Sequence, residues 1–484
     1  MKVLLSHSYF MPLDPKQWGA GQPYPPLGTM LAAAVLREAG YEVRLFDSQF
    51  SSVAEDVLPH LDAFRPDMFV ICDDSFNYLT KMCLTNMREA AFRMQEMAKQ
   101  RGCTVIVNSS DATDHAAKYL EHGADFVIKG EVEAALLELV NALRDQQPVT
   151  AIAGLVFSQE GKTITNAPRQ VMKALDELPL PAWDLVDMEK YRSVWKSHHG
   201  YFSLNVATTR GCPYKCNWCA KPIYGNRYNS RSPEQVVEEL AMLKEKFRPD
   251  HIWFCDDIFG LKPGWLKRFA ELVEAKKLRL RYKIQSRADL LLEEDNIDAL
   301  ARSGCKTVWM GAESGSQKIL DAMDKGTKVE QIREATRLLK KRGIEAAFFL
   351  QFGYPGETIE DIRLTIALLN ELLPEDIGIS VSYPLPGTKF YERVKSELKD
   401  KQNWSDSDDL ALMFRNTYSP GFYRQLHRYI HWNYRKHQGL ASLKKLLRGK
   451  AKRSDVRRAL LTAFYIPAAM AGHRRLKKTE HAWS

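Results

Sequence analysis

The sequence predicts an α/β protein with two parallel-sheet domains and a helical tail, on three observations. Strand and helix patterns alternate through residues 1–150, which is typical of a doubly wound, Rossmann-like parallel sheet. Six further strand–helix units follow within residues 199–395, as expected for a partial (β/α)6 barrel of the TIM type. Residues 396–484 continue neither pattern, and the net positive charge of the chain is concentrated in their C-terminal part.

The first domain is expected to contain five strands with helices between them. The strands are predicted at 2–5, 42–46, 68–72, 104–108 and 124–128, and the helices at 27–39, 79–101 and 134–145. Ligands of such sheets bind at the carboxyl ends of the strands. Because no G-x-G-x-x-G follows the first strand, a nicotinamide or flavin dinucleotide site is not expected.

A connector is predicted over residues 151–198, where the proline-punctuated run 178–183 favours extended chain. The barrel strands that follow are predicted at 204–208, 251–255, 281–285, 307–311, 346–351 and 377–382. Helical patterns cover 233–247 and 329–341. As in complete barrels, chemistry is expected at the carboxyl ends of these strands.

Three cysteines, Cys212, Cys216 and Cys219, form a C-x3-C-x2-C motif. Three thiolates on one loop can hold three corners of a 4Fe–4S cluster, which leaves the fourth iron open for another ligand. A structural zinc site is the main alternative, but it needs a fourth ligand from cysteines that are scattered singly along the chain. These are Cys72, Cys83, Cys103, Cys255 and Cys305. A disulfide is less favoured, because the N-terminus turns polar too soon for a signal peptide.

The segment 208–219 resembles the motif of the radical S-adenosylmethionine (SAM) superfamily, and Trp218 matches the aromatic residue before the third cysteine. The resemblance implies that the open iron chelates the methionine part of SAM. Electron transfer would then cleave the C–S bond and release a 5′-deoxyadenosyl radical. Each barrel strand is followed by a segment that could contact a bound SAM, and over residues 208–388 their order and spacing resemble one radical SAM subgroup.

Charged residues follow the second and third barrel strands. Asp256 or Asp257 could accept a charge-assisted hydrogen bond from the SAM ammonium, although either could instead cap a helix. Arg287 could pair with the SAM carboxylate through its planar guanidinium. The alternative for Arg287 is an ordinary salt bridge with Asp289.

The fourth and fifth strands are followed by segments that also resemble this subgroup. In the run 311–316, Glu313 is expected to accept hydrogen bonds from the ribose hydroxyls. Gly353 and Gly356 would allow the backbone to approach the adenine edge. Singly, each segment could be a turn or a cap.

The segments 25–43 and 123–131 resemble the cobalamin-binding domain that precedes many radical SAM cores. The resemblance implies a cobalamin site at Pro26, Leu27, Gly28, Asp73, Ser75, Asn108, Ser109, Ser110, Gly130 and Glu131. The D-x-H-x-x-G motif of many cobalamin proteins is missing, as it is in many cobalamin radical SAM enzymes. Ser109-Ser110 stands where Gly-Gly is common, and the segment 72–77 replaces a more usual Ser/Thr-rich turn. Since serine carries a Cβ, the backbone can approach a ligand less closely there. A domain that kept its fold and lost the cofactor is the alternative.

The tail is strongly basic. From 421 to 484 the chain has 16 Lys and Arg against 2 acids, a local charge of +14, so the total of +9 leaves about −5 elsewhere. A helix is predicted over 423–437, and the apolar run 459–471 is expected to be broken at Pro467 and is too short to span a bilayer. Such a tail could lie on a membrane surface, hold a lipid-like substrate, or simply close the barrel. No RNA-binding module is recognised, so a nucleic acid partner is not expected.

Together the resemblances imply a cobalamin-dependent radical SAM enzyme, in which methyl transfer to an unactivated carbon is the usual outcome. The alternatives are a cyclase or ring-rearranging enzyme without net methylation, a radical SAM enzyme with a vestigial cobalamin domain, and a non-catalytic metal scaffold. A tRNA methylthiotransferase is not expected, because the N-terminal half lacks the extra cluster cysteines of that family. The expected substrate is a small or lipid-like molecule, the reductant a flavodoxin or ferredoxin, and the compartment the cytoplasm.

Overall fold

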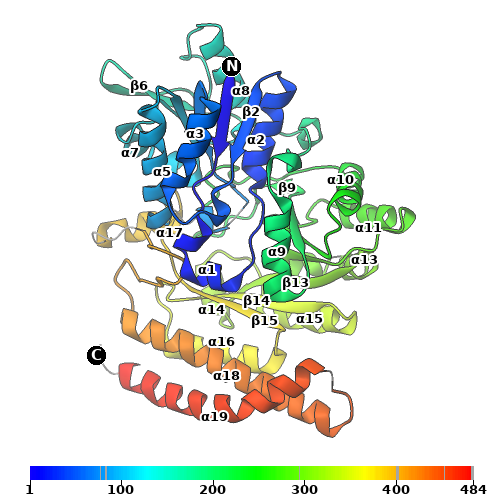
Figure 1. Ribbon diagram of the computed structural model, residues 1–484. Coiled ribbons are helices and arrows are strands. Elements are labelled where there is room, and N and C mark those ends of the chain that lie inside the picture. Colours follow the sequence, from blue (N-terminus) through cyan, green and yellow to red (C-terminus); the bar gives the residue numbers. More distant parts are fainter. Residues whose placement is uncertain (77, 82–83, 294, 399–402, 452, 481–484) are drawn as a thin grey trace.

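Figure 1 shows the computed structural model, which describes residues 1–484 except 77, 82–83, 294, 399–402, 452 and 481–484. The side chains at 78, 79, 454 and 480 are likewise not described. Cys83, considered above as a zinc ligand, lies outside the described residues. The prediction of an α/β fold with two parallel sheets and a helical C-terminal part is confirmed.

The first sheet has the strand order β2-β1-β3-β4-β5-β6-β7. Its parallel strands are β1 (Lys2–Ser6), β2 (Glu42–Phe46), β3 (Met68–Cys72), β4 (Thr104–Asn108) and β5 (Phe126–Ile128). The flanking helices include α2 (Leu27–Glu38), α3 (Leu58–Phe64), α5 (Thr85–Lys99), α7 (Ala116–Glu121) and α8 (Glu133–Arg144). The 2-1-3-4-5 order is that of flavodoxin-like sheets, which bind ligands where the strand order reverses, next to β1 and β3.

Two features of this domain differ from the sequence expectation. Within the predicted connector, β6 (Leu155–Gln159) and β7 (Lys162–Thr165) form an antiparallel hairpin that extends the first sheet. The helix predicted over 79–101 is divided into α4 (Tyr78–Lys81) and α5, and the N–H of Thr85 instead donates to the carbonyl of Trp404 in the tail.

The second sheet is a curved half-barrel in which all six strands are parallel and neighbours follow chain order. The strands are β8 (Ser203–Val206), β11 (His251–Phe254), β12 (Tyr282–Ser286), β13 (Cys305–Glu313), β14 (Glu345–Phe352) and β15 (Asp376–Val381). The covering helices are α10 (Pro233–Lys246), α11 (Trp265–Ala275), α13 (Asn296–Ser303), α15 (Val329–Lys341) and α16 (Ile359–Leu372). Local signals set their starts: Ser232 caps α10 with Pro233 in its first turn, and Thr358 and Asp361 form a capping box on α16.

One apolar core continues from the first domain into the half-barrel. Along β1 and β3, Leu4, Phe69 and Ile71 belong to the same buried cluster as barrel residues such as Phe254 and Tyr282. The opposite face of the first sheet packs against α2 and α8 as a separate core. Because side chains alternate across a strand, the first sheet is apolar on both faces, and one face joins the two domains.

The tail forms an antiparallel hairpin of two long helices, α18 (Pro420–Leu447) and α19 (Arg453–Glu480), at the bottom of Figure 1. The hairpin lies against α16, where the side-chain amide of Asn433 donates to Asn370. The expectation that the helix breaks at Pro467 is wrong, since α19 continues through this residue. Within the described residues, no helix is long and apolar enough to cross a bilayer.

Candidate active site between the two sheets

Both sheets direct the carboxyl ends of their strands into one interdomain space. Ser75, which follows β3, hydrogen-bonds through its hydroxyl to the hydroxyl of Tyr224 in the cysteine segment at 2.5 Å. Lys81 Nζ reaches Asp257 Oδ1, after barrel strand β11, at 2.5 Å. A ligand between the sheets would therefore contact loops of both domains.

The cysteine loop is fixed at its base. The short strand β9 (Thr209–Arg210) pairs with β10 (Asn229–Ser230), and Gly211 follows with φ of +77°. A Cβ at Gly211 would stand 2.4 Å from the carbonyl oxygen of Arg227, so glycine is required for the strands to close there.

Cys212, Cys216 and Cys219 are all partly exposed and free of disulfides. Burial raises the pKa of the Cys212 thiol and raises the pKa of Cys219 to about 12. Among the described residues, no group of three or more His, Cys, Asp or Glu side chains is arranged as a metal site. The number and type of these ligands, three thiols on one loop, are those of a cluster bound at three irons and open at the fourth, although the sulfur atoms are not gathered as in a metal-bound site.

Asp256 and Asp257 have different partners, although both were expected near the SAM ammonium. Asp256 is fully buried and accepts hydrogen bonds from the N–H and hydroxyl of Thr208 and the N–H of Thr209. Burial raises its pKa to about 6. Asp256 therefore holds the start of the cysteine loop, whereas Asp257 pairs with Lys81 from the first domain.

Arg287 lies beside the cysteines and is buried. Its guanidinium forms a bidentate pair with Asp289, at 3.0 and 2.8 Å, and stacks over the ring of Tyr214 at 3.7 Å. Its remaining nitrogen Nη1 lies 3.9 Å from Cys216 Sγ. The salt bridge considered as the alternative for Arg287 is thus present, and Nη1 still points at the cysteine loop.

Glu313 ends β13 with φ of +56°, an unusual conformation for a residue other than glycine. It is buried and accepts a hydrogen bond of 2.9 Å from Lys325 Nζ. Burial opposes the positive charge of Lys325 and acts to lower its pKa. The negative charge of Glu313, together with nearby Cys216, outweighs burial, so the pKa of Lys325 lies above its usual value. Lys325 belongs to the run that resembles the radical SAM subgroup, but the sequence did not indicate that it pairs with Glu313.

Two buried polar atoms near the cysteine loop lack a hydrogen-bond partner among the described atoms. They are Trp218 Nε1, between the second and third cysteines, and Thr327 Oγ1, two residues after Lys325. Buried polar groups are usually paired, so these atoms fit a polar cosubstrate such as SAM.

Gly353 and Gly356 have φ of +74° and +86° and form the turn after β14. The Gly353 carbonyl accepts a hydrogen bond from Asn416 at 2.5 Å, and its N–H donates to Glu357 at 2.6 Å. A Cβ on Gly353 would stand 3.2 Å from the ring of Tyr423 in α18. The start of α18 therefore packs directly on this turn.

Glu357 provides a pH-dependent test of this turn. Burial raises its pKa to about 8, so between pH 4.5 and 8 the folded chain retains a proton that the unfolded chain releases. Stability should therefore fall as pH rises through this window, by at most about 1.4 kcal/mol per pH unit from this group. Glu357→Gln should remove that slope, whereas Glu360→Gln, at an exposed position of α16, should keep it. Urea unfolding midpoints from pH 5 to 9 measure the difference, and parallel curves for all three proteins would contradict it.

The strand ends of the first domain bring the expected cobalamin residues to one edge. Asp73 accepts hydrogen bonds from the N–H and hydroxyl of Ser8, at 2.7 and 2.9 Å. The amide of Asn108 donates to the carbonyls of Ile128 and Gly130, at 2.9 Å each. Pro26 and Leu27 begin α2, and a Cβ on Gly28 would stand 3.3 Å from the Asp73 carbonyl oxygen.

The structure shows what Ser109 and Ser110 do at the position where Gly-Gly is common. Ser109 caps the short helix α6 (Ser110–Asp114) by accepting a hydrogen bond from the N–H of Ala112 at 2.8 Å. Ser110 Oγ is buried and has no hydrogen-bond partner among the described atoms. Burial also raises the pKa of Asp73, and raises that of neighbouring Asp74 to about 6. A buried, unpaired hydroxyl at the strand ends that also carry the carboxyls of Asp73 and Asp74 fits a polar ligand at this edge.

A buried ion-pair network links the first domain to the cysteine loop. Arg210, two residues before Cys212, pairs with Glu131 at 2.9 Å and with Glu133 at 2.5 Å. Glu131, expected at the cobalamin site, also accepts a hydrogen bond from the N–H of Met172. Sequence reasoning missed Arg210 and Glu133, which lie 77 residues apart and carry no local signal for pairing.

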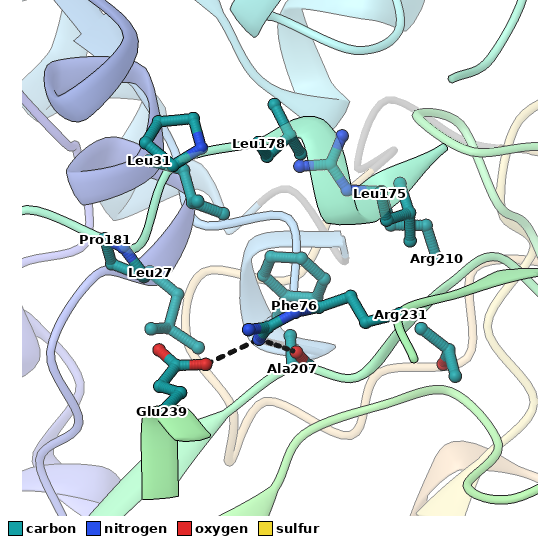
Figure 2. A pocket seen from close by; sticks show the side chains of 12 residues that line it. Leu27, Leu31, Phe76, Leu175, Leu178, Pro181, Ala207, Arg210, Arg231 and Glu239 are labelled. Atoms are coloured by element: carbon teal, nitrogen blue, oxygen red, sulfur yellow. Dashed lines mark hydrogen bonds and ion pairs between the residues drawn. The ribbon is translucent and has the colours of Figure 1, made fainter. Parts of the chain in front are cut away.

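Two cavities lie at this interface. The first is lined by α2, the connector and the start of the cysteine loop, with Arg231 bonded to Glu239 at its wall (Figure 2). The second lies at the carboxyl ends of β14 and β15 and includes Trp218. Its other aromatic walls are Tyr383 and Trp404, and Lys16 of the first domain contributes a cation. The second cavity is thus next to the cysteine loop and has mixed apolar and polar walls.

Comparisons with known protein families match both halves of this arrangement. The radical SAM superfamily model matches residues 206–369, and the B12 binding domain model matches residues 19–140. The first interval contains the three cysteines and most of the half-barrel, and the second contains most of the first sheet.

The chain is also similar to curated proteins along most of its length. It is 28% identical to an uncharacterised methyltransferase of Pyrococcus horikoshii, over 78% of this chain and 81% of the relative. It is 29% identical to the hopanoid C-3 methylase of Methylococcus capsulatus, over 87% of this chain and 79% of the relative. It is 25% identical to the anaerobic magnesium-protoporphyrin IX monomethyl ester cyclase of a Synechocystis strain, over 76% of this chain and 72% of the relative.

A solved structure shares the fold. The radical SAM methyltransferase TsrM from Kitasatospora setae, with cobalamin and a 4Fe–4S cluster bound, superposes with a TM-score of 0.68 and 20% identity. The similarity covers 82% of this chain and 74% of TsrM.

Proposed function

Because the chain belongs to the radical SAM enzymes that carry a B12-binding domain, we propose that it is a cobalamin-dependent methyltransferase. Its substrate would be a small or lipid-like molecule with an unactivated carbon. The observation that carries the proposal is the position of the cysteine loop, which faces the strand ends of the B12-binding domain across one interdomain space. A curated relative over 87% of the chain is a hopanoid methylase, which supports methyl transfer.

Cys212, Cys216 and Cys219 would hold the cluster, and the first-domain residues from Pro26 to Glu131 named above would hold cobalamin. When bound, the cluster would supply the electron that cleaves SAM, and cobalamin would carry the methyl group. Arg287 Nη1, next to Cys216, would attract the SAM carboxylate, and Glu313 would accept from a ribose hydroxyl while Lys325 fixes its orientation. Asp257 would present its carboxylate to the SAM ammonium.

The cavity beside Trp218 would receive the substrate. Its aromatic walls suit an apolar body, and Trp218 Nε1 and Lys16 could donate to polar groups. A reducing partner such as flavodoxin or ferredoxin would supply electrons, and an oxygen-sensitive cluster suits the cytoplasm. Any peripheral membrane contact would be made by the exposed surface of the two C-terminal helices, α18 and α19.

The reaction outcome can be tested by mass. Anaerobic, reduced holoenzyme with SAM and a small-molecule or lipid extract should yield a product heavier by one CH2. It should also yield S-adenosylhomocysteine and 5′-deoxyadenosine in about equal amounts, because one SAM donates the methyl group and another is cleaved. The similarity to the cyclase makes cyclisation without methylation the second candidate function. A product without added CH2, formed with deoxyadenosine and without S-adenosylhomocysteine, would support that candidate and contradict methyl transfer.

A further inference from the structure

The outer helix of the C-terminal hairpin exposes large apolar side chains along one stripe. We define the outer stripe as Val456, Leu460, Phe464 and Met470 of α19. Leu460 is 75% exposed, Phe464 is 62% exposed and Met470 is 57% exposed. Leu461 and Ile466 extend the exposed apolar surface beside the stripe.

The side of α19 that packs on α18 carries mainly small residues. Ala459, Thr462 and Ala469 are buried, and a Cβ on Gly472 would stand 2.9 Å from the ring of Trp432 in α18. A helix that only closes the protein directs its large apolar residues inward. In α19, Leu476 is buried in this way, whereas Leu460, Phe464 and Met470 each expose more than half of their surface.

Positive charges flank the outer stripe at both ends. Arg453 and Arg457 lie at the N-terminal end of the outer stripe, and Arg474, Arg475 and Lys478 lie beyond its C-terminal end. All five side chains are exposed. Among the described side chains of α19 the only acid is Asp455, which is buried and accepts hydrogen bonds from Ser442 and Lys445. The outer face therefore has an apolar centre, two cationic ends and no described carboxylate.

We propose that the outer face of α19 lies on the surface of an anionic lipid bilayer. An apolar stripe with flanking cations enters the headgroup region of a membrane in the plane of the surface, and anionic lipids attract the cations. The finding that no described helix can span a bilayer agrees with this in-plane position.

A second copy of the chain fits this face less well. In a twofold pairing of α19 across its centre, the helices run antiparallel. Arg453 and Arg457 of one copy would then face Arg474, Arg475 and Lys478 of the other, and like charges in an interface are unfavourable. Anionic lipid headgroups complement the same charges at both ends of the stripe.

Vesicle sedimentation of the full-length holoenzyme tests the proposal. Vesicles of phosphatidylcholine with about a third phosphatidylglycerol should bind the protein at least about tenfold better than phosphatidylcholine alone, and salt should weaken binding. The double variant Leu460→Asn/Phe464→Asn should lose about tenfold or more of this binding. Leu364→Asn is the matched control, because Leu364 is 52% exposed on α16, away from α19.

Deoxyadenosine formation without vesicles checks that each variant is folded, and it separates this inference from the proposed reaction. Equal binding to neutral and anionic vesicles, or unchanged binding of the double variant, would overturn the proposal. A dimer in sedimentation velocity that dissociates in the double variant would also overturn it, because the stripe would then be a contact between copies.

Discussion

Cys216→Ala is expected to abolish SAM cleavage. The substitution removes one of three thiolates on the cysteine loop, so the cluster loses a corner ligand. It also removes the sulfur that lies 3.9 Å from Arg287 Nη1, the nitrogen proposed to attract SAM. The measurement is 5′-deoxyadenosine formed after anaerobic reconstitution and chemical reduction, together with iron content.

The matched control for this substitution is Cys305→Ala. Cys305 is also a free cysteine, but it is buried at the amino end of β13, the end opposite the site. The control should retain iron and deoxyadenosine formation. Deoxyadenosine formation by Cys216→Ala at the wild-type rate would refute the assignment of the cysteine loop as the cluster site.

Arg210→Leu is expected to destabilise the protein strongly. It would leave Glu131 and Glu133 buried without their cation, and breaking a buried ion pair from one side costs about 3–5 kcal/mol. Arg210 also lies over the ring of Tyr224, so the substitution removes a cation–π contact within the cysteine segment as well. The expected result is a marked fall in the urea midpoint of unfolding.

Arg268→Leu is the matched control, because Arg268 pairs with Glu234 at the surface with both side chains about half exposed. Its removal should cost less than about 1 kcal/mol. A second measurement, protease cleavage within the 166–182 part of the connector, should accelerate in Arg210→Leu if the interface loosens. Equal midpoints for the two variants would contradict the role assigned to the buried network.

The strands were predictable because each is a short apolar run between turn residues. The predicted strands at 42–46, 68–72 and 104–108 have the same bounds as β2, β3 and β4. Apolar runs of this length, separated by helical periodicity, are a local property of the sequence. The β6–β7 hairpin was missed because Lys162–Thr165 is an exposed, polar edge strand without such a run.

Only the part of the site that one continuous stretch of sequence forms could be predicted. The cysteine loop is one continuous motif, so its spacing alone indicated the chemistry. The partners of Asp257, Glu133 and Glu313 are 176, 77 and 12 residues distant along the chain, and only the fold brings them together. Pro467 was expected to break the run 459–471, but packing of α19 on α18 outweighs one lost backbone hydrogen bond and the helix continues.

The cofactor content of the protein purified without oxygen and supplied with hydroxocobalamin tests the central claim most directly. Iron, sulfide and the visible spectrum of bound cobalamin are measured on the same sample. The account predicts about four irons and one cobalamin per chain. About four irons without retained cobalamin would contradict a cobalamin-dependent reaction, and would indicate that Ser109 and Ser110 belong to a domain that kept its fold and lost its cofactor.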